Sequence, residues 1–228
     1  RIQRNHSQNI PAAKHMKDST FVETIRIVNR EPQLIGYHQQ RLRRTSIEAF
    51  GSETHIDLRQ ILSPRFISDN CPAAAPHDTL KCRIVYSTEI RQIEILPYTP
   101  KEIRSLRIVC GEDIDYHLKK SDRSDLTRLA SLRGDCDEII ISRNGGIITD
   151  TSYSNLVFVT VDRQLLTPSD PLLKGVMRQS LLDSGIIKEA RLRCADITSG
   201  KNITHAVMIN AMLPLDLSRA IPIDRIKT

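Results

Sequence analysis

Three short stretches of this chain hold side chains that could do chemistry together. Lys119 precedes a predicted helix, Asp150 follows a predicted strand, and Gly175 opens another predicted helix. A lysine whose pKa is depressed is a nucleophile and a proton carrier, and a carboxylate can hold a cationic group. The N–H groups that open a helix can hold a phosphate. Singly, each has an ordinary interpretation as a solvated lysine, a turn residue or a loop, so only their combination indicates a site.

The elements that must position these residues follow a mixed pattern. Alternating β-branched residues over 21–28 predict a strand, and the helix formers over 38–50 predict a helix whose apolar side includes Ile47. Asn144-Gly145-Gly146 predicts a hairpin turn, and three prolines over 63–79 predict a loop. The other predicted strands are 81–87, 89–96, 106–110, 138–142, 146–149, 155–161, 165–167, 187–194 and 206–210, and the other predicted helices are 122–132 and 175–184. Since no βαβ unit repeats, the predicted fold class is α+β with many antiparallel hairpins.

Composition narrows the classes of partner. The 228 residues carry a formal net charge of +6, but no basic tract has interleaved aromatics, and tryptophan is absent. We therefore expect an anionic small molecule rather than a nucleic acid. No stretch approaches the roughly 20 apolar residues of a membrane span, and residues 1–17 lack the apolar core of a secretory signal. Five scattered cysteines without metal-ligand spacing predict reduced thiols, no metal site and a cytoplasmic protein.

Four separated blocks of sequence occur in an order that is typical of one enzyme family. They are Val22-Glu23-Thr24-Ile25-Arg26 with His38-Gln39-Gln40-Arg41-Leu42, then Lys119-Lys120-Ser121-Asp122-Arg123, then Ile148-Thr149-Asp150-Thr151-Ser152-Tyr153-Ser154-Asn155-Leu156, then Thr167-Pro168 with Gly175-Val176-Met177-Arg178 and Ile209-Asn210-Ala211-Met212. The chain resembles the class IV pyridoxal-phosphate aminotransferases, which include branched-chain aminotransferase, D-amino-acid aminotransferase and 4-amino-4-deoxychorismate lyase. The resemblance runs from about Phe21 to Asp216 and is weakest over 51–80.

The resemblance implies a two-domain fold like that of D-amino-acid aminotransferase, with pyridoxal 5′-phosphate in the cleft between the domains. Residues 16–100 would form a small α+β covering domain and residues 101–228 a hairpin-rich cofactor-binding domain, with the boundary near 97–104. Residues 1–15 would be an upstream extension or a cloning remnant. Relatives complete each site with residues from a second subunit, so the resemblance also implies a homodimer.

The resemblance assigns roles to individual residues. The cofactor lysine, which forms a Schiff base, falls on Lys119, because the family pattern is a lysine, three residues and an arginine, here Arg123. Lys120 lies one place late, and as a neighbouring cation it would help to depress the pKa of Lys119. The partner of the pyridine nitrogen, usually glutamate, falls on Asp150, which is one methylene shorter. Asn155 matches a family asparagine, although a structural hydrogen bond explains it equally well.

The remaining contacts concern the phosphate and the substrate. The resemblance places the phosphate at Arg41, at the backbone N–H groups of Val176 and Met177, and at Asn210 and Ala211. Arginine suits this role because it can bind the anion through two charge-assisted hydrogen bonds. Arg26 and Arg91 are candidates for a substrate carboxylate, and surface charge explains them equally well.

The reaction is the least determined feature. Lys17-Asp18-Ser19-Thr20 replaces the family's G-D-G turn, and the stretch from Arg41 to Lys119 is shorter than usual, so the covering domain is trimmed. The segments 175–179 and 210–214 resemble the lyase more than the transaminases. We therefore expect a 4-amino-4-deoxychorismate lyase, which releases pyruvate and 4-aminobenzoate for folate synthesis. The alternatives are a class IV transaminase of the D-amino-acid or branched-chain type and a catalytically degenerate member that only binds the cofactor.

Overall fold

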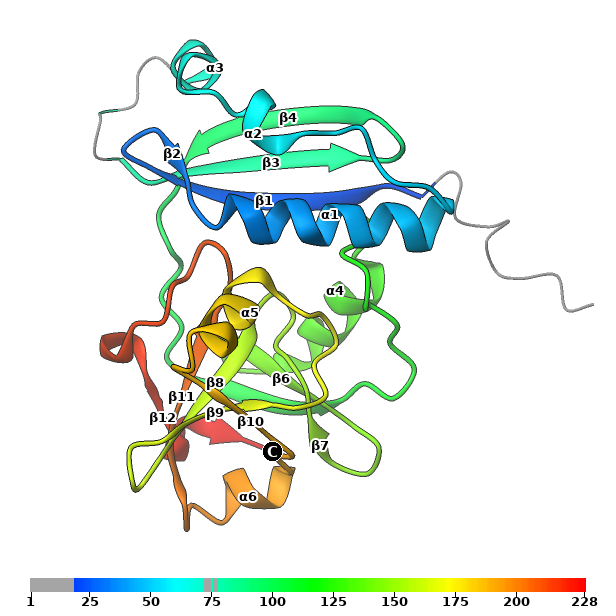
Figure 1. Ribbon diagram of the computed structural model, residues 1–228. Coiled ribbons are helices and arrows are strands. Elements are labelled where there is room, and N and C mark those ends of the chain that lie inside the picture. Colours follow the sequence, from blue (N-terminus) through cyan, green and yellow to red (C-terminus); the bar gives the residue numbers. More distant parts are fainter. Residues whose placement is uncertain (1–18, 72–74, 76–77) are drawn as a thin grey trace, which may run out of the picture.

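A computed structural model describes residues 19–71, 75 and 78–228 (Figure 1). Residues 1–15, expected to be an N-terminal extension, lie outside the described part of the chain. Among the residues described, no helix is long and apolar enough to cross a membrane.

A four-stranded antiparallel sheet forms the first half of the chain. Its strands are β1 (Phe21–Val28), β2 (Glu31–Pro32), β3 (Leu80–Tyr86) and β4 (Ile90–Pro97), in the order β2-β1-β3-β4. Along β3 every second residue is buried, because alternate side chains of a strand point to opposite faces of the sheet. The buried face packs against α1 (Ile35–Phe50), which lies along the sheet in Figure 1 and contributes Leu42 and Ala49 to the core. The other face of the sheet, which carries Lys81, Arg83 and Val85 of β3, does not pack against this core.

Two further sheets form the second half. One has the order β10-β9-β8-β11-β12 and the other the order β13-β5-β6-β7. Their strands are β5 (Leu106–Cys110), β6 (Glu138–Arg143), β7 (Ile147–Ile148), β8 (Asn155–Thr160), β9 (Leu165–Pro168), β10 (Lys188–Ala190), β11 (Ile203–Ile209), β12 (Ile221–Pro222) and β13 (Ile226–Lys227). The helices are α4 (Ser124–Ala130), α5 (Val176–Asp183) and α6 (Cys194–Thr198), with short 3₁₀ turns at Ser131–Arg133, Leu217–Arg219 and Ile223–Arg225. Ile140, Leu156 and Phe158 belong to the core cluster that joins the two sheets.

The segment predicted as a loop over 63–79 is largely helical in its first part, so that prediction is wrong there. It contains α3 (Pro64–Asn70), which follows the short helix α2 (Leu58–Ile61). The Ser63 hydroxyl accepts the N–H of Phe66, and Pro64 occupies the first turn, where its missing N–H is not needed. The prolines therefore start a helix instead of excluding one.

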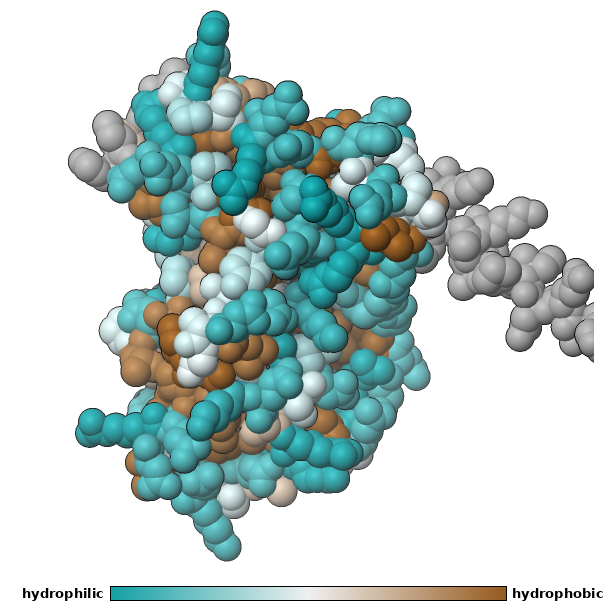
Figure 2. Space-filling model, viewed as in Figure 1, coloured by the Kyte–Doolittle hydropathy of each residue, from teal (hydrophilic) through white to brown (hydrophobic). Residues whose placement is uncertain are grey.

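The two halves meet through the backbone. The N–H of Val22 in β1 donates to the carbonyl of Lys119 at 2.9 Å, and the N–H of Ser121 donates to Thr20 at 2.8 Å. The first sheet lies wholly before residue 98 and the other two wholly after residue 105, which is the α+β arrangement that the sequence predicted. The boundary near 97–104 stays a prediction. In the space-filling view the surface is mostly hydrophilic, with a waist between the halves and apolar residues gathered just below it (Figure 2).

Candidate active site

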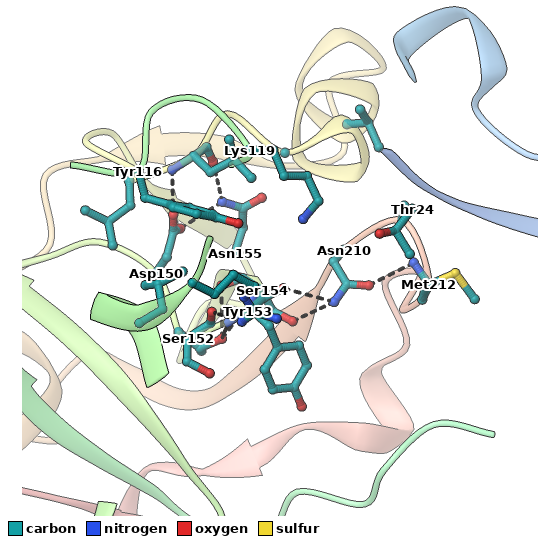
Figure 3. A pocket seen from close by; sticks show the side chains of 18 of the residues that line it. Thr24, Tyr116, Lys119, Asp150, Ser152, Tyr153, Ser154, Asn155, Asn210 and Met212 are labelled. Carbon is teal, nitrogen blue, oxygen red and sulfur yellow. Dashed lines mark hydrogen bonds between the residues drawn. The ribbon is translucent and has the colours of Figure 1, made fainter. Parts of the chain in front are cut away.

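A cavity of about 340 Å³ is lined by residues from both halves of the chain. Thr24 reaches it from β1, Lys119 from the loop before α4, and Asp150 from the end of the hairpin that contains β7. Figure 3 shows these side chains around the same space, together with Asn155 and Asn210. The structure thus brings side chains more than one hundred residues apart into one site.

Lys119 has the electrostatic environment of a reactive amine. The hydrogen bond from the Val22 N–H to the Lys119 carbonyl fixes Lys119 beside β1. Burial, together with the cations Arg41, Arg123 and Arg83, lowers the pKa of Lys119 to about 7 against the opposing effect of Glu23. A large fraction of the amine is therefore unprotonated near neutral pH, which a nucleophile or proton acceptor requires.

Lys120 does not play the part that the sequence suggested for it. Its Nζ lies 3.6 Å from the carboxylate of Asp115, and its side chain is not part of the cavity lining. The cations that depress the pKa of Lys119 come from elsewhere in the fold. The main charge effects on the Lys119 amine therefore come from Arg41, Arg123 and Arg83, while the Lys120 side chain turns to Asp115.

Asp150 is held in one orientation by two donors. Its side chain is only 4% exposed. Nδ2 of Asn155 donates to Oδ1 at 2.8 Å, and the N–H of Leu173 donates to Oδ2 at 3.0 Å. Burial raises the pKa of Asp150 to about 6, and the two hydrogen bonds limit that rise. A cation placed in the cavity beside this carboxylate would favour its ionised form.

Arg41 is already engaged on one side. Its Nε and Nη2 donate to the two oxygens of Glu23 at 2.8 and 2.6 Å, and Nδ1 of His38 lies 2.5 Å from Glu23. Burial would raise the pKa of Glu23, but Arg41 and His38 hold it at about 2. Burial lowers the pKa of His38, so this ring is neutral. Arg41 lines the cavity, yet its two-donor edge is bound to Glu23, and an anion would meet the remaining Nη1.

The turn after β11 is also fixed by hydrogen bonds. Nδ2 of Asn210 donates to Oγ of Ser154 at 2.8 Å, while its Oδ1 accepts the N–H of Met212 at 2.8 Å. Asn210 and Ala211 line the cavity, as does Val176 at the first position of α5. Met177 is not among the lining residues, and its side chain packs against the apolar cluster under α5.

The two substrate-binding candidates lie outside the cavity lining. Arg26 is in β1, opposite Lys81 of β3. Arg91 is exposed in β4, and its Nε donates to Oγ of Ser87 at 2.9 Å. The cavity instead receives Lys81 and Arg83 from β3. Lys81 and Arg83 are not among the site residues that the sequence indicated. The pattern that could have indicated them is two cations at alternate positions of an otherwise apolar strand.

The chain is similar to known proteins over most of its length. Residues 20–215 match the model of the family described as amino-transferase class IV. A Haemophilus influenzae protein of uncharacterised function is 36% identical over 190 residues, which is 83% of this chain and 96% of that protein.

Solved structures agree with this match. A Haemophilus somnus protein provisionally named 4-amino-4-deoxychorismate lyase is 30% identical with a TM-score of 0.76, covering 87% of this chain and 98% of that one. A hypothetical aminotransferase from Mycobacterium tuberculosis in its PLP-bound form shares the fold at 18% identity, with a TM-score of 0.72 over 94% of this chain and 83% of that one. This chain therefore belongs to the class IV aminotransferase family and is an enzyme of that pyridoxal-phosphate-dependent class.

Proposed function

We propose that this chain binds pyridoxal 5′-phosphate covalently through Lys119 and acts on an amine substrate in the cavity. The observation that carries the proposal is the pairing of an amine whose pKa is about 7 with a buried carboxylate on one cavity. These residues fit the cofactor, because an aldehyde needs an unprotonated amine and a pyridine nitrogen needs an acidic partner. The cofactor supplies a ring that withdraws electrons from the reacting carbon of the substrate.

The residues of the chain divide the remaining work. Lys119 Nζ can take a proton from the carbon beside the substrate amine and return it, because its pKa lies near the working pH. The Asp150 carboxylate would keep the ring nitrogen protonated. Nη1 of Arg41 and the N–H groups at the start of α5 would hold the phosphate. The two hydrogen bonds with Glu23 orient Arg41, and the Glu23 carboxylate cancels much of the Arg41 charge.

We infer that the reaction is the cleavage of 4-amino-4-deoxychorismate to pyruvate and 4-aminobenzoate, a step of folate synthesis. The provisional name of the Haemophilus somnus relative and its coverage of nearly the full length of both chains support this choice. Incubation of the purified protein with 4-amino-4-deoxychorismate, beside a panel of amino acids with 2-oxoglutarate or pyruvate, tests it. Formation of 4-aminobenzoate supports the lyase, and amino-group transfer to the oxo acid would replace it with a transaminase. A protein that binds the cofactor and converts neither substrate would be a degenerate member.

We also propose a homodimer that works in the cytoplasm. The apolar side chains of Ile47, Leu132 and Leu217 are about half exposed, which suits burial against a second copy. All five cysteines are free, as in proteins of reducing compartments. Sedimentation at micromolar concentration should give a dimer, and an active protein that sediments only as a monomer would remove this proposal.

A further inference from the structure

The cavity has a wall of two cations that the cofactor contacts described above do not use. Lys81 and Arg83 alternate along β3 with Leu80, Cys82 and Ile84, which are buried in the core. Alternation places the two cations on the opposite face of the sheet, and both line the cavity. Because β3 is an interior strand of the sheet, its neighbours β1 and β4 hold this pair in place.

These two cations lie in a row that begins beside Lys119. Val22, whose N–H donates to the Lys119 carbonyl, pairs with Val85 across β1 and β3. Two residues further along β1, Thr24 pairs with Arg83, and two residues beyond that Arg26 pairs with Lys81. Each step of two residues spans about 7 Å along a strand. A molecule attached near Lys119 and lying along the sheet therefore passes Arg83 first and Lys81 second.

The guanidinium of Arg83 has no hydrogen bond or ion pair with any residue that the structure describes, although Glu94 faces Arg83 across β3 and β4. The other arginines of the cavity are engaged, Arg41 with Glu23 and Arg123 with the carbonyl of Ser152. The Nζ of Lys81 lies 6.0 Å from the centroid of the Tyr98 ring and has no ion pair with the part of the chain that the structure describes. Arg83 and Lys81 therefore remain available to an anion other than the phosphate proposed at Arg41.

The charges around the cavity do not balance. The charged residues that line it are Arg41, Lys81, Arg83, Lys119 and Arg123, and the carboxylate of Asp150. The Glu23 carboxylate offsets the charge of Arg41, and Arg41 and the start of α5 would bind a cofactor phosphate. The surplus at Arg83 and Lys81 then has no counterpart among the residues that line the cavity. Half-buried cations of this kind are stabilised by an anionic ligand, since carboxylates form charge-assisted hydrogen bonds with them.

We propose that Arg83, with Lys81 beside it, determines substrate specificity by binding a carboxylate that is remote from the reacting amine. The substrate class is then a compact amine with two carboxylates, rather than an amino acid with an apolar side chain. This inference rests on the proposed function for the position of the amine at Lys119. Arg83 binds this remote carboxylate, and Lys81, two residues away along β3, assists it.

The test uses benzene-1,3-dicarboxylate and benzoate as non-reacting probes of the cofactor-loaded full chain, with calorimetry to measure Kd. Wild type should bind the dicarboxylate more tightly than benzoate. Arg83→Gln should raise the Kd of the dicarboxylate about tenfold or more, since one charge-assisted contact is lost, and should change that of benzoate by less than about threefold. Arg83→Lys should recover part of the loss. Arg44→Gln, which removes an exposed cation of α1, is the matched control and should change neither Kd.

The outcomes separate this inference from the proposed function. Cofactor uptake is measured independently by visible absorbance and by mass analysis of the reduced adduct at Lys119. A loaded chain whose Arg83→Gln variant binds the dicarboxylate as wild type does, or loses both probes equally, overturns the role of Arg83 and leaves the cofactor assignment intact. A chain that takes up no cofactor but still needs Arg83 to bind the dicarboxylate overturns the cofactor assignment and supports the anion site.

Discussion

Asn155 holds the carboxylate of Asp150 with the same nitrogen that binds the backbone of Leu173. Nδ2 of Asn155 lies 2.8 Å from Oδ1 of Asp150 and 2.8 Å from the carbonyl oxygen of Leu173. The N–H of Leu173 closes the arrangement on Oδ2 of Asp150 at 3.0 Å. Every oxygen of the carboxylate therefore accepts from a fixed donor. This explains how a side chain one methylene shorter than glutamate can be held firmly at its place in the site.

Asp150→Asn should slow turnover by roughly a hundredfold. An uncharged amide cannot keep a ring nitrogen protonated, and the loss of about 3 kcal/mol at the transition state has this effect on the rate. The measurement is kcat of the loaded variant beside wild type. Near-normal turnover would mean that Asp150 has only a structural role.

The same variant should change how the stability of the apo-protein depends on pH. The folded pKa of Asp150, about 6, lies above its ordinary value of 3.8. Its contribution to stability is therefore present below about pH 4 and is lost as the pH rises through about 6. Wild type should lose Tm relative to Asp150→Asn over this window. The amide also places a donor against one of the two N–H groups, so the variant is not neutral for folding. Parallel pH profiles of Tm would contradict the buried, raised pKa.

Gly175→Ala should weaken the hydrogen bonds that hold the Asp150 carboxylate, although residue 175 does not itself bond to Asp150. Its φ of −69° suits alanine, but the added Cβ would lie 2.0 Å from Oδ1 of Asn155. Asn155 must then move and release Asp150, at a cost of about 1–3 kcal/mol in stability. Cofactor Kd and Tm are the measurements. Gly36→Ala is the control, because the nearest atom to its added Cβ is the end of the Arg59 side chain at 3.9 Å. Unchanged cofactor binding by both variants would refute the role of Asn155 in holding Asp150.

Lys119→Ala should abolish the visible absorbance of the bound cofactor, and Lys120→Ala should retain it. Lys119 lines the cavity with a pKa of about 7, whereas Lys120 is turned to Asp115. Borohydride reduction of wild type followed by peptide mass analysis should label Lys119. A label on Lys120 would overturn the assignment of the Schiff base to Lys119.

His117→Gln should reduce stability more at pH 6 than at pH 9. Nδ1 of His117 contacts Asp115, and Nε2 lies 2.6 Å from Glu48 of α1, so the ring joins the two halves of the chain. The hydrogen bond to Asp115, with that to Glu48, raises the pKa of His117 against a smaller effect of burial. The stabilisation is complete below the pKa of the unfolded chain, about 6.5, and is lost as the pH rises through the higher folded value. The nearby cation Lys120 pairs with the same Asp115. The difference in Tm between wild type and variant, followed across pH, measures the stabilisation by protonated His117. Because the ring is half exposed, this difference should be small.

The sequence by itself indicated many of the elements and singled out Lys119, Asp150 and Asn155, which the structure places on one cavity. The alternation over 21–28 and the helix formers over 38–50 gave β1 and most of α1, because the period of apolar residues is a local property. The resemblance to the family's lysine-to-arginine pattern favoured Lys119 over Lys120, and of the two it is Lys119 that lines the cavity. The α+β class followed from the same local patterns, and the family followed from four blocks of sequence that resemble it.

Only the tertiary structure decided what those residues contact. Ile47 belongs to the apolar pattern of α1 and yet is 50% exposed, while the polar Thr45 of the same helix is buried. Alternation in β3 marks two faces, but nothing local says that the face of Lys81 and Arg83 meets a cavity while Arg26 and Arg91 stay outside it. The pKa values of Lys119 and Asp150 likewise depend on burial and on charges from distant parts of the chain. Periodicity specifies which residues share a face, and only the packing of distant segments fixes the solvent, charges and donors that each face meets.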